Sequence, residues 1–200
     1  MKLLPTQYSK KIEAGTDEAG RGCLAGPVTA AAVILSKNFS NPDLNDSKKI
    51  SAKKRNELRE VIEKEAVAYS VVHINNHKID KINILNASML AMHQAIKKLK
   101  IIPGFILVDG NRFYNYENLE HKCIISGDSK FQNIAAASIL AKTYRDELMI
   151  KLDKKHPEYN WNNNKGYPTK SHKKSILEYG PSVYHRKSFR LFDIQTELKF

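Results

Sequence analysis

The sequence predicts an α/β protein with a mixed or mainly parallel sheet and helices on both faces of that sheet. Short apolar segments of strand length alternate along the chain with longer segments of helical periodicity. The strands mostly precede helices, which is the order in which parallel strands are connected. A chain of 200 residues can bury one sizeable core without disulfides or structural metal. We therefore expect a single domain over residues 1–200, including a C-terminal helical region at about 150–200.

Five segments have the composition of strands. The first runs from Ile12 to Asp17, where Gly15 weakens it and Gly20 and Gly22 end it. The others are rich in alanine and β-branched residues, or are short and apolar. They are Val28–Leu35, Val67–Ile74, Phe105–Val108 and Cys123–Ile125.

Four segments have helical periodicity. Ser51 is the expected N-cap of a helix over Ala52–Glu65. In Ile84–Lys100, large apolar side chains recur at spacings of three and four, until Pro103 and Gly104 stop the helix. Two further helices are expected at Ile134–Lys151 and Thr169–Tyr179, and loops at Leu44–Ile50 and Pro157–Pro168.

The chain is strongly basic. It has 33 Lys and Arg against 21 Asp and Glu, a formal net charge of +12. Half of this excess falls in residues 151–200, with 11 basic against 5 acidic residues. Such an excess favours a polyanionic partner, although it also fits a lysine-rich protein with a solvated basic surface.

Cysteine usage and hydropathy indicate where the protein works. Cys23 and Cys123 lie in no CxxC pair, and no Cys/His cluster has zinc-site spacing. The N-terminus lacks the apolar core of a signal peptide, and no segment approaches the roughly 18 apolar residues of a spanning helix. We therefore expect a cytoplasmic, reduced protein with no membrane partner.

Two adjacent carboxylates, Asp17 and Glu18, come just before Gly20, Arg21 and Gly22. Neighbouring side chains of a regular strand point to opposite faces, so both acids can reach one site only if the strand ends or kinks there. The glycines supply that break and let backbone N–H groups approach a ligand, and the arginine fork suits phosphate. The pattern also fits a charged loop in which the glycines only turn the chain.

Two more acids follow predicted strands. Asp109 comes directly after Phe105–Val108, and Asp128 follows the next short strand. Ligand sites in open α/β sheets lie beyond the carboxyl ends of strands, although Asp109 with Gly110 also fits a turn and Asp128 an N-cap. Phosphodiester hydrolysis by two divalent ions needs such acids, and Mg²⁺ prefers oxygen ligands. Acids gathered in a basic protein make sense if a cation lies between them and phosphate.

Eight motifs, in one order, resemble those of the ribonuclease HII family. Seven are spread from Asp17 to Thr169: DEAGRG with LAGPV, LNDSKK, INILNASMLAM, VDGN, GDS, IAAASILAK with YRD, and KGYPT. The eighth is HRKSF at His185–Phe189. Cys23 departs from the family, which often has proline after GRG.

The resemblance implies a ribonuclease H-like fold and hydrolysis of the RNA strand of RNA–DNA hybrids. It also implies nicking on the 5′ side of single ribonucleotides in duplex DNA, leaving 3′-hydroxyl and 5′-phosphate ends, with two Mg²⁺ or Mn²⁺ ions during catalysis. The catalytic metal ligands would be Asp17, Glu18, Asp109 and Asp128. Asp146 of YRD competes for the fourth place, but it lies inside a predicted helix whereas Asp128 directly follows a strand. A monomer is expected.

The resemblance also implies substrate contacts. Gly20, Arg21 and Gly22 would read the 2′-OH, the group that separates RNA from DNA, and Tyr167 would stack on the following deoxyribose. Without the resemblance, Tyr167 is a packing aromatic in a loop, and the basic residues are an ordinary solvated face. Further contacts would come from Lys48, Lys49, Arg186 and Lys187 to phosphates, and from Ser138 and Lys142 on the long helix.

Other classes of protein fit parts of this pattern. A junction resolvase, or a related ribonuclease H without the junction preference, would share the acids. A DNA-only nuclease would not need Gly20–Gly22 together with Tyr167. A non-catalytic hybrid-binding protein is disfavoured because unmetallated acids weaken binding to phosphate. The order of the motifs argues against a purely structural basic protein.

Overall fold

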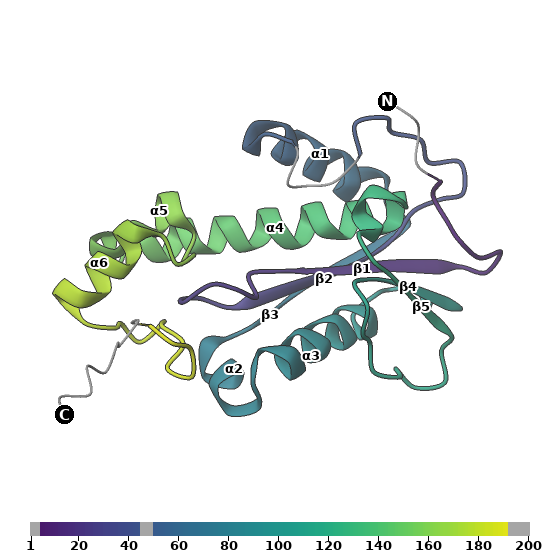
Figure 1. Cartoon of the computed structure of the whole chain (residues 1–200). Helices are drawn as coiled ribbons and strands as arrows, with labels where there is room; N and C mark the ends of the chain where they lie inside the picture. The colour runs from purple at the N-terminus through teal and green to yellow at the C-terminus, as the bar shows by residue number, and fades with distance from the viewer. Residues whose placement is uncertain (1–4, 45–49, 192–200) are drawn as a thin grey trace.

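A five-stranded mixed sheet forms the centre of the computed structural model, which describes residues 5–44 and 50–191. The strands lie in the order β3-β2-β1-β4-β5, with helices on both faces of the sheet (Figure 1). β1, β2 and β3 pair antiparallel, whereas β4 runs parallel to β1 and β5 parallel to β4. The predicted α/β class, with a mixed sheet between helices, is confirmed.

All five predicted strands are present, and their ends shift by a few residues. They are β1 (Glu13–Ala19), β2 (Val28–Ile34), β3 (Ala68–Ile74), β4 (Phe105–Asp109) and β5 (His121–Ile124). The main difference is that β1 continues past Asp17, its predicted end, and this difference shapes the site described below.

The four predicted helices are also present. The longer helices are α1 (Ala52–Glu65), α3 (Ile84–Lys97), α4 (Gln132–Asp153) and α6 (Lys170–Tyr179). The expected N-cap of α1 is confirmed, because the Ser51 hydroxyl accepts from the Lys54 N–H at 3.2 Å. No helix within residues 5–44 and 50–191 has the length and apolar character needed to cross a membrane.

Several short helices lie in segments predicted to be loops or left unassigned. They are α2 (Asn76–Ile82), α5 (Trp161–Asn164) and two 3₁₀ turns, η1 (Gly127–Ser129) and η2 (Pro157–Tyr159). These elements are too short to show helical periodicity in the sequence. α2 and α3 are separated by Asn83, whose φ of +63° ends one helix while its side chain caps the next.

The helices cover the two faces of the sheet with small residues between them. On β2, Ala30 and Ala32 pack with the α3 cluster, whereas Ala31 packs with the cluster of α1 and α4. On β1, a Cβ added to Gly15 would lie 2.3 Å from the carbonyl carbon of Asn133. Gly15 is therefore the residue that lets the start of α4 lie directly on β1.

The C-terminal region packs around Trp161, which is fully buried with Tyr159 and Ile176. Main-chain hydrogen bonds join this region to the chain between β1 and β2, from the Leu24 N–H to the Gly166 oxygen at 2.8 Å among others. The C-terminal region therefore supports the loop that follows the two acids of β1.

Candidate active site at the ends of strands β1 and β4

Strands β1 and β4 separate where β1 carries its two acids. Their parallel pairing ends with Thr16 opposite Val108, whereas β1 stays paired with β2 up to Ala19. The predicted end at Asp17 is two residues too early, because β1 ends at Ala19, directly before Gly20, where the glycines predict its end. The pairing with β4 stops earlier than the strand does, which exposes an edge at Asp17 and Glu18.

The two acids belong to opposite faces of the sheet. Asp17 shares a face with Gly15 and accepts a hydrogen bond from the Ser138 hydroxyl of α4. Glu18 lies on the α3 side, where it lines a cavity of about 360 Å³ with Met89. Because the edge of β1 is open here, both carboxylates also border a second cavity of about 300 Å³, which we call the site cavity.

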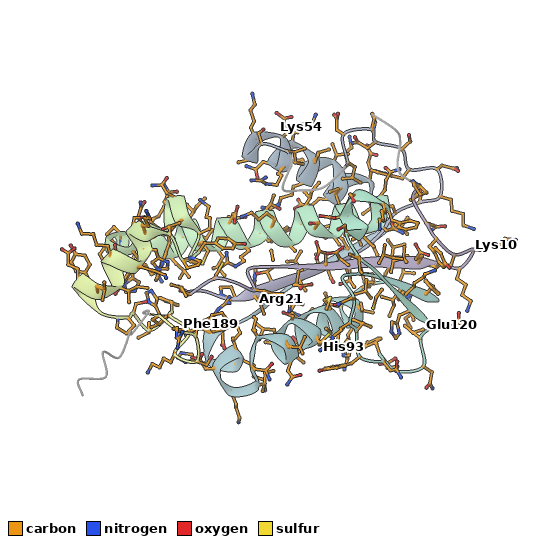
Figure 2. All side chains as sticks on the ribbon, viewed as in Figure 1. Lys10, Arg21, Lys54, His93, Glu120 and Phe189 are labelled. Atoms are coloured by element: carbon orange, nitrogen blue, oxygen red, sulfur yellow. The ribbon has the colours of Figure 1, made fainter. Side chains whose placement is uncertain are left out.

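The site cavity brings together most of the residues expected from the sequence. Its walls come from β1, the loop of residues 20–27, the end of β4, the helices α1 and α4, and the chain after α5. Arg21 lies between the α4 layer and the α3 layer (Figure 2). The lining residues are Asp17, Glu18, Ala19, Gly20, Arg21, Gly22, Arg55, Asp109, Ser138, Lys142 and Tyr167.

Asp109 is held in place at the end of β4 by the turn that follows β5. Its Oδ1 atom accepts from the Gly127 N–H at 2.6 Å. Asp128 is the next residue in that turn, and its side chain is buried, with 3% exposed. Asp128 lines neither cavity, so the structure brings three of the four expected acids to the site cavity and leaves the fourth buried in the turn that bonds Asp109.

Asp17 and Glu18 are poorly solvated, and the carboxylates of the site cavity lie close enough for their charges to repel. Burial raises the pKa of Asp17 well above its usual range, and the charges of Glu18 and Asp109 raise it further, against a hydrogen bond from Ser138. Burial also raises the pKa of Glu18, although Arg21 opposes this through an ion pair at 3.1 Å. Burial and like charge therefore disfavour the ionised form of Asp17 in the absence of a bound cation.

The donor set fits a hard divalent cation. Among the described residues, no three His, Cys, Asp or Glu side chains are placed closely enough to hold a metal ion in the arrangement seen. The chemistry is nevertheless appropriate: the candidate ligands Asp17, Glu18 and Asp109 offer only carboxylate oxygens, which Mg²⁺ and Mn²⁺ prefer. A bound cation would also relieve the repulsion that raises the pKa of Asp17.

The glycines of the loop at residues 20–27 differ in their surroundings. Gly20 has a φ of +90°, and an added Cβ would lie 2.0 Å from Nε of Arg145. Gly22 is exposed, and an added Cβ would meet nothing within 4 Å. Gly20 is therefore required by conformation and packing, whereas at Gly22 the absent side chain leaves the backbone open to a ligand.

Tyr167 presents part of its ring to the site cavity, with 37% of the residue exposed. Its hydroxyl forms a hydrogen bond with Cys23, and burial, followed by Cys23, raises the pKa of Tyr167 to about 12. The Lys142 ammonium lies 5.6 Å from the ring centre. The tyrosine is thus anchored at its hydroxyl end and neutral at physiological pH.

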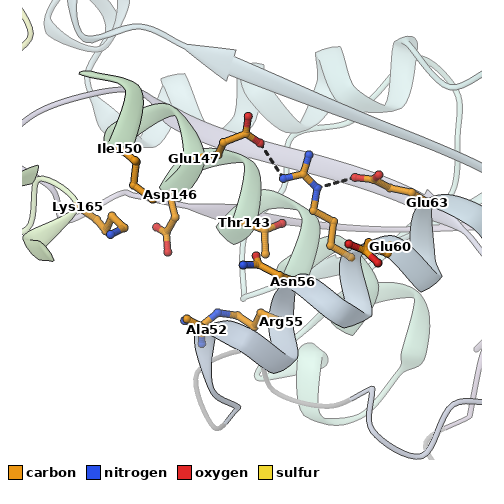
Figure 3. A pocket seen from close by; sticks show the side chains of 11 residues that line it. Ala52, Arg55, Asn56, Glu60, Glu63, Thr143, Asp146, Glu147, Ile150 and Lys165 are labelled. Atoms are coloured by element: carbon orange, nitrogen blue, oxygen red, sulfur yellow. Dashed lines mark hydrogen bonds and ion pairs between the residues drawn. The ribbon is translucent and has the colours of Figure 1, made fainter. Parts of the chain in front are cut away.

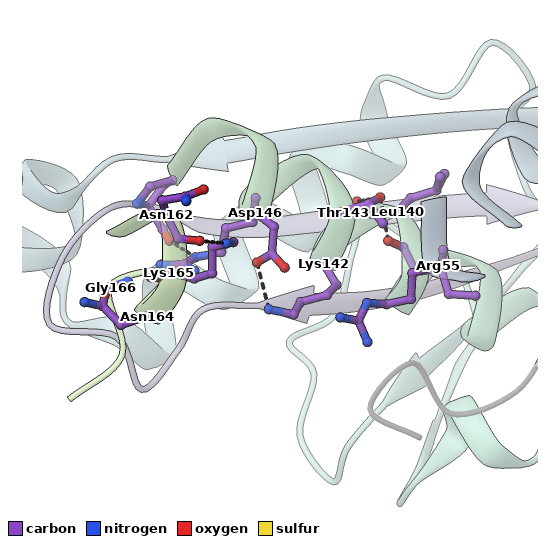
Figure 4. A network of polar contacts seen from close by, with 12 residues as sticks. Arg55, Leu140, Lys142, Thr143, Asp146, Asn162, Asn164, Lys165 and Gly166 are labelled. Atoms are coloured by element: carbon purple, nitrogen blue, oxygen red, sulfur yellow. Dashed lines mark hydrogen bonds and ion pairs between the residues drawn. The ribbon is translucent and has the colours of Figure 1, made fainter. Parts of the chain in front are cut away.

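Asp146 lines a different cavity, a groove of about 530 Å³ between α1 and α4 (Figure 3). Its carboxylate forms an ion pair with Lys142 at 2.7 Å (Figure 4). Arg59 in the same groove is bonded to Glu63 and Glu147 (Figure 3). The groove is lined by four acids against three basic side chains, so its charge does not favour phosphate.

The remaining expected contacts lie elsewhere. Lys48 and Lys49 fall outside the described residues. Arg186, expected to contact phosphates, is 0% exposed, and its guanidinium donates to main-chain carbonyl oxygens inside the protein. Sequence reasoning did not single out Arg145 or Arg55. The YRD motif contains Arg145, but only the three-dimensional contacts show what it bonds.

The chain is similar to proteins of one family over nearly its whole length. The profile of the family described as Ribonuclease HII matches residues 14–192. The ribonuclease HII of Christiangramia forsetii is 59% identical over 194 residues, which cover 96% of this chain and 98% of that protein. The ribonuclease HII of Parabacteroides distasonis is 56% identical over 198 residues, which cover 99% and 100%.

A solved structure shows the same fold. The ribonuclease H2 from Pyrococcus horikoshii OT3 aligns with a TM-score of 0.74 at 24% identity, covering 90% of this chain and 94% of that one. The ribonuclease H-like fold expected from the motifs is confirmed.

Proposed function

The chain belongs to the ribonuclease HII family of metal-dependent endoribonucleases, and from this premise we propose what its site cavity does. It hydrolyses the RNA strand of RNA–DNA hybrids and nicks duplex DNA on the 5′ side of a single embedded ribonucleotide, leaving 3′-hydroxyl and 5′-phosphate ends. The observation that carries the proposal is that three acids, an exposed glycine turn and Tyr167 line one cavity.

In this proposal Asp17, Glu18 and Asp109 hold the divalent ions, and Asp128 completes the set from the turn that bonds Asp109. Two Mg²⁺ or Mn²⁺ ions, when bound, supply an activated water and stabilise the charge on the leaving oxygen. The protein's own contribution is to orient the carboxylates. Ser138 donates to Asp17, and the turn before Asp128 donates to Asp109.

The sugar at the cut would be read by the loop of residues 20–27. Gly22 leaves its backbone accessible, so N–H groups there can approach a 2′-OH, which DNA lacks. Tyr167 would stack on the next sugar, and its neutral hydroxyl end is held away from the substrate by Cys23. Lys142 and Arg55 bring positive charge to the same cavity and would position phosphates.

We further propose that residues 1–200 act as one catalytic domain, with the region from about residue 150 onward supporting the loop of residues 20–27. In this proposal the protein acts as a monomer, because one chain carries all the acids. Lys48 and Lys49 are proposed as phosphate contacts on the strength of their motif alone.

The test uses a labelled DNA duplex with one embedded ribonucleotide, an all-DNA duplex and a uniform RNA–DNA hybrid, each with Mg²⁺ or Mn²⁺. We expect a single cut 5′ of the ribonucleotide, cleavage of the hybrid and no cleavage of all-DNA duplex. Asp109→Asn should abolish both activities, whereas Asp43→Asn, which changes an exposed acid paired with Lys54, should abolish neither.

Each alternative predicts a different result. Cleavage of the hybrid without a cut at the single ribonucleotide would leave the metal site in place and remove the junction role of Gly22 and Tyr167. Cleavage of all-DNA duplex would favour a DNA nuclease of the same fold. Tight binding of the hybrid without turnover in either metal would favour a hybrid-binding protein.

A further inference from the structure

The loop of residues 20–27 is held by two arginines, Arg145 and Arg186, that are 0% exposed. Their guanidiniums donate to main-chain carbonyl oxygens at 2.7–3.1 Å. A buried guanidinium must have its donors satisfied, and its planar fork can reach several acceptors at fixed angles. Each arginine therefore fixes the relative positions of the chain segments that supply its acceptors.

Arg186 ties the loop to itself. Its Nη1 and Nη2 donate to the oxygens of Arg21 and Gly20 at 2.8 and 2.7 Å. Its Nε and Nη2 donate to the oxygens of Gly26 and Pro27 at 3.0 and 2.9 Å. All four acceptors lie between residues 20 and 27, so Arg186 draws the two ends of the loop together.

Arg145 ties the loop to a second segment. Its Nε and Nη2 donate to the oxygens of Pro27 and Ala25 at 2.9 and 3.1 Å, but its Nη1 donates to the oxygen of Lys165 at 2.8 Å. Lys165 is two residues before Tyr167, and the Arg145 guanidinium carbon lies 5.7 Å from the tyrosine ring centre. Arg145 therefore joins the loop of residues 20–27 to the segment that carries Tyr167.

Two glycines make this junction possible. A Cβ on Gly20 would lie 2.0 Å from the Arg145 side chain. A Cβ on Gly166, whose φ is +82°, would lie 2.6 Å from the Ala25 oxygen, beside the bond from the Leu24 N–H to the Gly166 oxygen. The close approach of the loop to the tyrosine segment is thus built into the backbone on both sides of Arg145.

We propose that Arg145 is a positioning residue that fixes Tyr167 relative to Gly22. Gly22 can then contact the ribose of the ribonucleotide while Tyr167 stacks on the sugar that follows it. This inference rests on the proposed function. A ribonucleotide followed by a deoxyribonucleotide is distinguished only if the 2′-OH reader and the stacking ring keep a fixed separation. A long hybrid has no such junction at most of its cleavage sites, so it depends less on that separation.

The first experiment compares Arg145→Lys and Tyr167→Ala, alone and together, on the single-ribonucleotide duplex and on the long hybrid. Lysine keeps the charge but cannot reach three carbonyls in a fixed plane. We expect Arg145→Lys to lower kcat/KM for the single ribonucleotide by about 10- to 100-fold, the scale of a misplacement near 1 Å. The hybrid should change by less than about threefold. In the Tyr167→Ala background, Arg145→Lys should have no further effect on the preference.

Arg186→Lys is the matched comparison, because it also replaces a buried arginine that holds the same loop. It acts on the loop alone, so we expect it to lower cleavage of both substrates together. Equal losses on both substrates for Arg145→Lys, or a full effect of Arg145→Lys without Tyr167, would overturn the proposal. If Arg145→Lys does not fold, Gly166→Ala disturbs the same junction and should show the same selective loss.

A readout independent of activity separates this inference from the proposed function. Hydrogen exchange should become faster at the Leu24 amide in Arg145→Lys, while the amides of β1 stay protected. Unchanged exchange would overturn the inference whatever the enzyme cleaves. If the wild type fails to nick the single ribonucleotide, the sugar-reading role falls with the proposed function, and the exchange result still shows whether Arg145 joins the two segments.

Discussion

Two buried polar regions flank the loop of residues 20–27, and they treat polar groups in opposite ways. In the site cavity, Asp17 has its pKa raised by burial and by the charges of Glu18 and Asp109. In the C-terminal cluster, which we define as Tyr159, Trp161, His172 and His185, the ring nitrogens of both histidines lie within hydrogen-bond distance of protein partners. Burial disfavours the ionised form of an acid in the first region, whereas the second region buries neutral imidazoles whose ring nitrogens face protein partners.

The hydrogen bonds of the C-terminal cluster assign its tautomers. Trp161 Nε1–H donates to Nε2 of His172 at 3.0 Å, so His172 carries its proton on Nδ1 and donates it to the Tyr167 oxygen at 2.9 Å. The Ser182 N–H donates to Nδ1 of His185 at 2.9 Å, which leaves the proton of His185 on Nε2, facing His172 at 3.2 Å. Both imidazoles are therefore neutral.

The difference shows how to tell a functional buried group from a structural one. Unrelieved like charge costs stability and is retained where a ligand or reaction uses it. A satisfied network contributes stability and holds neighbouring segments in place. Here the C-terminal cluster supports Tyr167 through its main chain, whereas the site cavity keeps an acid whose ionised form is disfavoured by burial and by its neighbours.

The largest expected effect comes from removing charge at the site cavity. Asp17→Asn should lower turnover at least about 1,000-fold if Asp17 is a ligand of the divalent ions, as proposed above. In metal-free protein it should raise Tm by about 2–4 °C, because about 1 kcal/mol of buried repulsion disappears. Thermal melts with and without Mn²⁺ check this: the ion should raise Tm of the wild type much more than that of Asp17→Asn.

A matched control for Asp17→Asn is Asp43→Asn, since Asp43 is an exposed acid with a side chain 54% accessible. It should change neither turnover nor the shift in Tm with Mn²⁺. A metal-free Tm that falls in Asp17→Asn would mean that the site cavity stabilises the fold, and the contrast between the two regions would be lost.

The next largest effect is expected at Arg186, a buried residue whose guanidinium donates to main-chain oxygens. Arg186→Met would leave the carbonyls of Gly20, Arg21 and Gly26 without a guanidinium donor and that of Pro27 with Arg145 alone. We expect a loss of about 3–5 kcal/mol in the free energy of unfolding, the scale for breaking a buried charged network. Urea denaturation measures it.

The control for Arg186→Met is Arg190→Met, which changes an exposed arginine four residues away. It should shift the free energy of unfolding by less than about 0.5 kcal/mol. Equal effects of the two substitutions would show that the burial of Arg186 contributes nothing beyond an ordinary surface residue.

The sequence predicts the parts of this molecule that depend on local pattern. Apolar periodicity locates the strands and the longer helices, and the position after a strand identifies Asp109 as a candidate ligand. The sequence does not explain correctly why Asp17 and Glu18 line one cavity. That arrangement depends on where the pairing of β1 with β4 stops, and strand register is a long-range property.

The role of Arg186 could not be predicted for a related reason. Its position in HRKSF, among basic and polar residues, favours an exposed phosphate contact, whereas its acceptors lie 159 to 166 residues earlier in the chain. Arg145 likewise bonds Ala25 and Pro27, which lie 120 and 118 residues earlier in the chain. Whether such a basic residue lies at the surface or in the core depends on carbonyl groups far away in the sequence. Their positions are known only from the three-dimensional structure.

An intermediate effect is expected from pH at the C-terminal cluster. Burial, followed by the neighbouring His172, lowers the pKa of His185 from 6.5 to about 4. The unfolded chain therefore takes up a proton at higher pH than the folded chain does. The contribution of neutral His185 to the free energy of unfolding is complete above about pH 6.5. It is lost as the pH falls toward 4, by up to about 3 kcal/mol.

Urea denaturation between pH 7 and pH 4 measures this loss against His185→Asn, whose amide oxygen can still accept from Ser182 but does not titrate. The variant should be less stable at pH 7 and should lose less stability than the wild type as the pH falls. Parallel slopes for the two proteins would mean that His185 is charged in the folded state or titrates normally, against the neutral tautomer assigned above.

The smallest effect is expected from Trp161→Phe, and it is the most informative about how far the two regions are coupled. Phenylalanine removes the donor to His172 but keeps a ring near Tyr159, which stacks on Trp161 at 5.0 Å. His172 Nε2 still faces His185, so the loss should be about 1 kcal/mol, or about 2–4 °C in Tm. Cleavage of both substrates should persist, because the site cavity is untouched. A selective loss on the single-ribonucleotide duplex, measured well below Tm, would instead show that the cluster sets the position of Tyr167 through His172 and that the two regions act as one.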